Sequence, residues 1–146
     1  MRPEAARAIP SYTGEVLDTA LGVTLIHEHI FVGDTELDLN FPHPEWDEGA
    51  AVSAAVRGLT ELHTLGVDTV ADLTVLGLGR NAELVARVAA ESPVRILAAT
   101  GYYAAEILPP FFRLNGPGLL VDGPEPLTRM FLSDIREGIA GTGVRA

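Results

Sequence analysis

Three apolar, β-branched segments alternate with stretches of helical periodicity along this chain. Buried strands are expected at Val23–Ile26, Val67–Thr74 and Val94–Thr100. Apolar residues recur at helical spacing in the three stretches that follow, from Asp47 to Gly66, in Arg80–Glu91 and in Leu127–Ile139. Strands that alternate with helices form parallel sheets, because a helix crosses over between neighbouring strands. The sequence therefore predicts an α/β fold built from about three βα units.

The length limits how this sheet can be completed. A (β/α)₈ barrel needs about 250 residues, whereas this chain has 146. It would supply three of the eight units, because the last helix is followed only by Gly141–Ala146, where a further strand is expected to begin. An open sheet of three strands is the alternative. For three of eight barrel strands on their own, Val23, Leu25, Val70 and Ile96 or their neighbours are expected to lose cover on the inner face of the sheet.

Two histidines follow the first expected strand at alternate positions. Side chains two residues apart on a strand point to the same face, so His27 and His29 can bind one metal ion from one side. Neutral imidazole is a common ligand for zinc, and catalytic zinc sites use about three protein ligands. The helical zinc-protease motif is excluded because Phe31 stands where its second histidine is required. A pair of surface histidines at a strand end is the alternative.

Charge and composition exclude several classes of partner. The net charge is −10, and all ten basic residues are arginine. An acidic chain without a basic stripe is a poor ligand for nucleic acid or anionic membranes. The chain has no cysteine, so thiolate metal sites and disulfides are excluded. No apolar run approaches the ~20 residues of a membrane span, and Met1–Pro10 lacks the apolar core of a signal peptide. We therefore expect a cytoplasmic protein.

A glycine-rich loop offers a different function. Gly77–Ala82 follows a strand and opens a helix, which matches the dinucleotide-binding pattern G-x-G-x-x-A. That pattern usually includes an acidic residue at the end of the next strand, but this strand ends in Leu97-Ala-Ala-Thr100. A nucleotide-binding α/β module therefore stays as an alternative, beside a simple turn between strand and helix.

Four motifs together resemble the phosphotriesterase family, within the amidohydrolase superfamily. They occur in the family's order and near its spacing, and the Gly-Leu-Gly-Arg loop and the Tyr-Tyr pair are most similar to the phosphotriesterase-like lactonases. The motifs are Gly22–Phe31, Val70–Asn81, Ala98–Tyr103 and Phe131–Thr142. The resemblance implies that residues 1–146 form a single incomplete domain, the N-terminal part of a TIM-type (β/α)₈ barrel, with residues 1–11 as a tail.

The resemblance also implies roles for individual residues. His27 and His29 match two metal ligands on the family's first strand, and Tyr103 falls where the family places an aromatic residue over the substrate. Asp72 matches a family aspartate at the tip of the second strand, without a role attached. The family's bridging lysine, two further histidines and catalytic aspartate lie on later strands and have no counterpart here. No catalytic residue is therefore expected within this chain.

The activity implied is that of a metal-dependent hydrolase. Two divalent ions, zinc first and iron, cobalt or manganese as alternatives, would hold a hydroxide that attacks lactones or other esters, with organophosphate triesters as further substrates. A homodimer is implied for the full-length enzyme. This chain is then either a fragment of a longer enzyme or a truncated product, a catalytically dead remnant.

Overall fold

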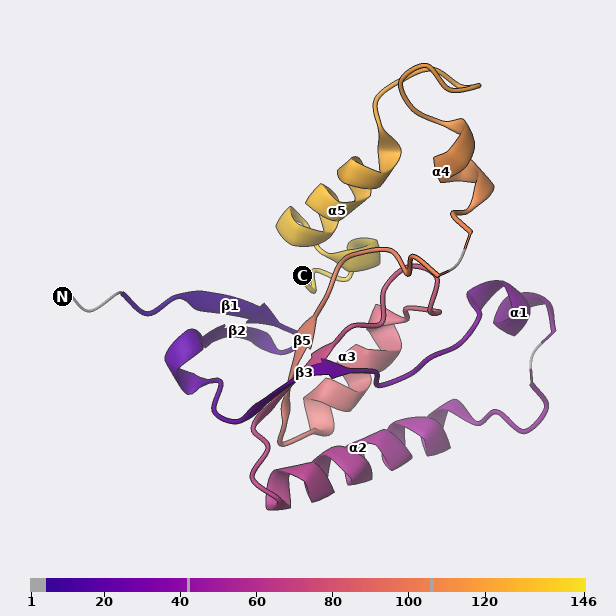
Figure 1. Cartoon of the computed structure of the whole chain (residues 1–146). Helices are drawn as coiled ribbons and strands as arrows, with labels where there is room; N and C mark the ends of the chain where they lie inside the picture. Colours follow the sequence, from indigo (N-terminus) through magenta and orange to yellow (C-terminus); the bar gives the residue numbers. More distant parts are fainter. Residues whose placement is uncertain (1–4, 42, 106) are drawn as a thin grey trace.

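A parallel sheet of three strands lies at the centre of the computed structural model, which describes residues 5–41, 43–105 and 107–146 (Figure 1). Its strands stand in the order β3-β4-β5, so neighbours in the sequence are neighbours in the sheet. They are β3 (Thr24–Glu28), β4 (Thr69–Asp72) and β5 (Arg95–Ala98). All three expected strands are present. Strands β4 and β5 are shorter than their apolar segments, whereas β3 continues two residues beyond Ile26 and includes His27 and Glu28.

The two helices that connect these strands are the ones the periodicity predicts. Helix α2 (Glu48–Thr64) begins at Asp47, whose carboxylate accepts the backbone N–H of Ala50. Helix α3 (Ala82–Glu91) begins at Asn81, which accepts the N–H of Leu84 in the same way. These side chains satisfy backbone donors that have no partner inside the helix. The α/β architecture of successive βα units is therefore confirmed.

The apolar core lies between the sheet and these two helices. Val70 and Ile96 are fully buried, and they pack with Val52 and Leu59 of α2 and with Val88 of α3. The expectation that Val70 and Ile96 lose cover is therefore wrong. Paired residues of parallel strands share a face, and the Leu25–Val70–Ile96 row faces the helices instead of the opposite side. Leu25 is partly buried against the same core.

The other side of the sheet is not covered in the same way. Ile26 is exposed there, and β3 is an edge strand that pairs only with β4. Val23, just before β3, is also exposed. At the opposite edge, the backbone N–H of Tyr12 donates to the carbonyl of Ile96 in β5. Burial raises the pKa of the Tyr12 phenol, and the charge of Asp72 raises it further. Helices thus pack on one side of the sheet, the covered side, while the other side, here called the open side, is exposed at Ile26 of β3.

A hairpin precedes the sheet and includes part of the segment expected as a tail. Strands β1 (Ala8–Ser11) and β2 (Gly14–Leu17) pair antiparallel, and β1 lies in the segment expected as a tail. The Ser11 hydroxyl donates to the carbonyl of Gly14 and closes the turn. A 3-10 helix, η1 (Asp18–Ala20), leads from the hairpin toward β3. The assignment of residues 1–146 to one incomplete domain stays a prediction.

Two short helices lie outside the three stretches where helical periodicity was expected. Helix α1 (Thr35–Asn40) is capped by Asp34, and α4 (Pro110–Leu114) begins with a proline at its first turn. Helix α5 (Pro126–Arg136) and the 3-10 helix η2 (Ile139–Gly141) replace the single expected helix. The break falls at Gly138, whose φ of 114° ends the α-helix. In Figure 1, α4 and the loop after it project away from the sheet.

A buried ion pair fastens α5 to the carboxyl end of the sheet. Arg80 Nη1 lies 2.7 Å from Asp134 Oδ2, and the side chains are only 13% and 5% exposed. The hydroxyl of Thr100 donates to the same oxygen at 2.6 Å. This cluster joins the loops after β4 and β5 to α5, so it helps to fix the end of the sheet where the candidate site lies.

Candidate functional site

The two predicted metal ligands lie side by side at the carboxyl end of β3. His27 is in the strand, and His29 directly follows it. Their ring centroids are 5.5 Å apart, with the ring planes at 77°. Both side chains are exposed on the open side of the sheet. The structure thus brings the pair together, as the alternating spacing predicts.

A bulge in β3 determines how the strand presents these side chains. Leu25 pairs with Val70, but Glu28 pairs with Asp72, so three steps along β3 match two along β4. A bulge re-aims the side chains beside it. Leu25 therefore faces the core while His27 and His29 remain exposed. Simple alternation would have placed Leu25 and His27 on one face.

His29 has an anchor that the sequence did not reveal. Its Nδ1 lies 3.0 Å from the hydroxyl oxygen of Thr74, in the loop after β4. That hydroxyl donates to Asp72 Oδ1 at 2.6 Å, and the N–H of Thr74 donates to the same oxygen at 3.0 Å. The available signal was Asp72 followed two residues later by a threonine, the spacing at which an aspartate accepts a backbone N–H. Thr74 itself was not predicted as a site residue.

Asp72, at the tip of β4, is almost completely buried in this arrangement. Burial raises the pKa of its carboxyl, while hydrogen bonds from Thr74 and from the N–H of Ile30 oppose the rise. A buried polar group costs stability unless it is hydrogen-bonded, and these donors satisfy it. Asp72 thus connects the histidine-bearing end of β3 to the loop after β4.

The donor pair fits a divalent metal as two of its ligands. A zinc ion lies 2.0–2.1 Å from an imidazole nitrogen, so two rings at a tetrahedral angle have centres about 5 Å apart. The observed 5.5 Å is close to that separation. Among the described residues, no group of three or more His, Cys, Asp or Glu side chains could hold a metal. His27 and His29 could therefore supply only part of a catalytic site.

Tyr103 lies at the same edge of the sheet, in the segment after β5. Its backbone N–H donates to the carbonyl of Leu76, in the loop after β4, and its side chain is partly exposed. Within the described parts of the chain, it makes no hydrogen bond or ring contact with His27 or His29. Its position over a substrate therefore stays a prediction.

The glycine-rich loop is explained by close packing. Gly79 has a φ of +71°, and a Cβ atom there would lie 2.4 Å from the carbonyl oxygen of Gly33. A Cβ on Gly77 would meet the Tyr103 side chain at 3.3 Å. Both positions therefore require glycine for backbone geometry and close approach. Phosphate binding is not needed to explain these glycines.

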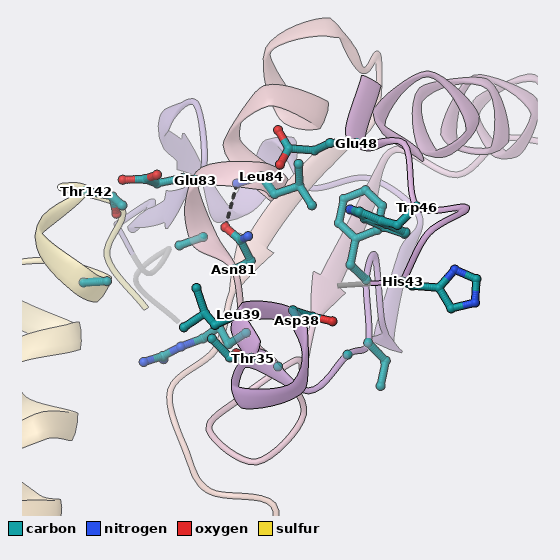
Figure 2. Close-up of a pocket in the computed structure, with 17 residues that line it drawn as sticks. Thr35, Asp38, Leu39, His43, Trp46, Glu48, Asn81, Glu83, Leu84 and Thr142 are labelled. Atoms are coloured by element: carbon teal, nitrogen blue, oxygen red, sulfur yellow. Dashed lines mark hydrogen bonds between the residues drawn. The ribbon is translucent and has the colours of Figure 1, made fainter. Parts of the chain in front are cut away.

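A pocket of about 600 Å³ adjoins this loop and the start of α3. Phe31 and Trp46 stand edge to face in its wall, with ring centroids 6.3 Å apart. Figure 2 shows carboxylates from three elements around it, which belong to Asp38, Glu48 and Glu83. Negative side chains disfavour a phosphate at this helix N-terminus. The pocket is not lined by His27, His29 or Tyr103, so the histidine site and this pocket are separate places.

The other two histidines make local contacts. His43 Nδ1 accepts the backbone N–H of Glu45 in the turn before α2. His63 Nδ1 lies 3.1 Å from the carbonyl oxygen of Val67, just beyond the end of α2. Neither histidine contacts the His27–His29 pair. Each bond stabilises a local turn, and His43 also lines the pocket beside α3 (Figure 2).

Comparison with known proteins identifies the family. The model of the phosphotriesterase family matches residues 8–146. The chain belongs to the phosphotriesterase family. It is 50% identical over 131 residues to the phosphotriesterase homology protein of Mycobacterium tuberculosis, and 34% identical over 122 residues to the aryldialkylphosphatase of Saccharolobus solfataricus.

A solved structure of the phosphotriesterase from Mycobacterium tuberculosis shows the same architecture. The two chains superpose with a TM-score of 0.90 at 45% identity, over 96% of this chain and 43% of that one. The predicted TIM-type (β/α)₈ architecture, present as three βα units, is therefore confirmed.

The match covers only part of each relative. The alignments span 89% and 84% of this chain but 40% and 36% of the Mycobacterium tuberculosis and Saccharolobus solfataricus relatives. The chain therefore spans well under half the length of these relatives. Among the described residues, no helix has both the length and the apolar character needed to cross a bilayer.

Proposed function

We propose that this chain contributes to a metal-dependent hydrolase that cleaves esters, with lactones as the preferred class and organophosphate triesters as further substrates. The observation that carries the proposal is the His27–His29 pair, which converges at the carboxyl end of a parallel strand in a phosphotriesterase-family fold. Active sites of (β/α)₈ barrels lie at this end. We use "complete enzyme" for this chain joined to the sequence that supplies the remaining ligands.

His27 and His29 would hold one of two divalent ions, with zinc the first choice and iron, cobalt or manganese as alternatives. Such ions supply Lewis acidity toward the scissile oxygen and lower the pKa of water. The protein's own contribution is to fix the rings: β3 carries both, and Thr74 anchors His29. Tyr103 would shape the substrate pocket from the segment after β5.

The preference for lactones rests on two motifs. Gly77–Arg80 and Tyr102–Tyr103 resemble the lactonase branch of the family. The structure places the two motifs against each other, because a Cβ on Gly77 would meet the Tyr103 side chain and Tyr103 donates to Leu76. The two motifs would form one wall of the substrate-binding site beside His27 and His29.

A homodimer is proposed for the complete enzyme. Apolar side chains are exposed along the projecting segment that includes α4, which is the kind of surface that subunit contacts cover. They are Ile107, Phe111, Leu114, Leu119, Leu120 and Val121. A cytoplasmic location stays a prediction.

Hydrolysis by the purified complete enzyme tests this function. A panel of lactones, carboxylic esters and organophosphate triesters is assayed before and after chelation and after metal is restored. We expect metal-dependent turnover with lactones first, and its near loss in His27→Ala, while His43→Ala keeps the wild-type rate. A folded protein without metal-dependent hydrolysis of any class would support the inactive remnant instead.

A further inference from the structure

Thr74 and Asp72 form a short hydrogen-bonded chain that ends on His29. The order of donors along it follows from chemistry. Asp72 Oδ1 accepts the backbone N–H of Thr74, so that oxygen does not carry a proton. It can only accept, whether the carboxyl is ionised or holds a proton on its other oxygen. The Thr74 hydroxyl must therefore donate its single proton to Asp72.

This assignment leaves only lone pairs on the Thr74 oxygen for its second partner. His29 Nδ1, 3.0 Å away, must then be the donor. A neutral imidazole carries one proton, so its Nε2 keeps a lone pair. A lone pair on imidazole is what a metal requires, and the partner of the other nitrogen sets which nitrogen has it.

We propose that Thr74, oriented by Asp72, is a positioning residue that holds His29 as the Nδ1–H tautomer and presents its Nε2 to the divalent metal. The inference rests on the proposed function for the identity of the ligand, but the tautomer is a property of the metal-free protein. His27 differs, because the described residues give its ring an edge contact with His29 and no hydrogen-bond partner. Before metal binds, a hydrogen bond therefore fixes the ring of His29, whereas the ring of His27 is held only by its contact with His29.

The other two histidines provide internal references. His63 Nδ1 faces the carbonyl oxygen of Val67, which can only accept, so neutral His63 must be the Nδ1–H tautomer. His43 Nδ1 accepts the N–H of Glu45, so His43 must be the Nε2–H tautomer. One spectrum of ¹⁵N-histidine-labelled protein therefore contains a standard for each form.

The test is a long-range ¹H–¹⁵N correlation spectrum of the metal-free complete enzyme, recorded above the pH at which its histidines are protonated. We expect His29 to show the Nδ1–H pattern of His63. In Thr74→Val, which keeps the shape but loses the hydroxyl, His29 should move toward the Nε2–H pattern that free imidazole favours. Thr74→Ser keeps the hydroxyl and should retain the wild-type pattern, even if Thr74→Val folds poorly.

Metal binding gives the second measurement. Loss of the anchoring partner of a metal-bound histidine lowers metal affinity by roughly 10–100-fold, so Thr74→Val should bind zinc more weakly by that factor and Thr74→Ser near normally. A His29 signal of the Nε2–H type in the wild type, or one unchanged by Thr74→Val, would overturn the proposal even if the enzyme hydrolyses lactones. The Nδ1–H pattern in a protein that binds no metal would instead refute the proposed function and leave the tautomer assignment standing.

Discussion

On one side of the three-stranded sheet, α2 and α3 cover Val70 and Ile96, which are 0% and 1% exposed. On the other side, Ile26 in the middle of β3 is 77% exposed, and the exposed His27 and His29 follow it. The two sides are built from the same short strands, yet one is a closed core and the other carries the candidate metal ligands.

The two sides differ in which parts of the sequence pack against them. The covered side is packed by α2, which lies between β3 and β4 in the sequence, and by α3, which lies between β4 and β5, so three consecutive units cover it. The inner side of a barrel is filled by residues from all of its strands. The three units cover the side that packs against helices, and the side that carries the candidate metal ligands stays exposed at Ile26.

The largest expected effect is on the folding and solubility of the 146-residue chain on its own. Unpaired strand edges and exposed apolar side chains promote association, so we expect this chain to be aggregation-prone or molten, and inactive as a hydrolase. Ile26→Lys on the open side should increase the soluble monomer in size-exclusion chromatography. Ile96→Lys should abolish folding, because it buries an unpaired charge in the core.

Two results would contradict this contrast between the sides. A monodisperse wild-type monomer with a sharp cooperative melt would show that the open side needs no cover. Equal losses of soluble protein in Ile26→Lys and Ile96→Lys would show that the two sides are packed alike.

The second effect compares a buried ion pair with an exposed one. Asp134 is held by Arg80 and Thr100 with little exposure, whereas Glu48 and Arg87 pair at the surface with about half of each side chain exposed. Removing one partner of a buried pair costs about 3–5 kcal/mol, so Asp134→Ala should lower the free energy of unfolding of the complete enzyme by about that amount. Glu48→Ala should cost less than about 1 kcal/mol. Urea unfolding measures both losses of stability. Similar losses in the two variants would refute the role of the Arg80–Asp134 ion pair in fastening α5.

The smallest expected effect is on substrate choice. Tyr103→Phe and Tyr103→Trp should change the ratio of kcat/KM between lactones and triesters by about 10-fold, because the side chain would shape the pocket without binding metal. Metal content should stay near that of the wild type. Loss of metal in Tyr103→Phe, or unchanged kinetics across the panel, would show that its role has been misassigned.

The sequence predicted most of the covered side. Apolar periodicity is a local signal, and it located α2, α3 and the three strands of the parallel sheet. The placement of Val70 on an inner face was wrong because periodicity shows that a strand has two faces without showing which one the helices cover. Helices α1 and α4 were missed because segments of six and five residues carry little periodicity.

The candidate site was predictable only where one strand contains it. The spacing of His27 and His29 indicated that the rings would meet, and the structure brings them together. Thr74 is 45 residues from His29, so no local pattern connects them. The bulge in β3 was equally invisible, because it depends on the register with β4.

The central claim is that the open side of the sheet is the metal-binding side. Metal content per chain, measured by inductively coupled plasma mass spectrometry after dialysis, tests it most directly in the complete enzyme. We expect His29→Ala to lose metal and nearly all turnover, while His43→Ala, which changes a histidine in a turn away from the pair, keeps both. Full metal stoichiometry and full rate in His29→Ala would contradict the account.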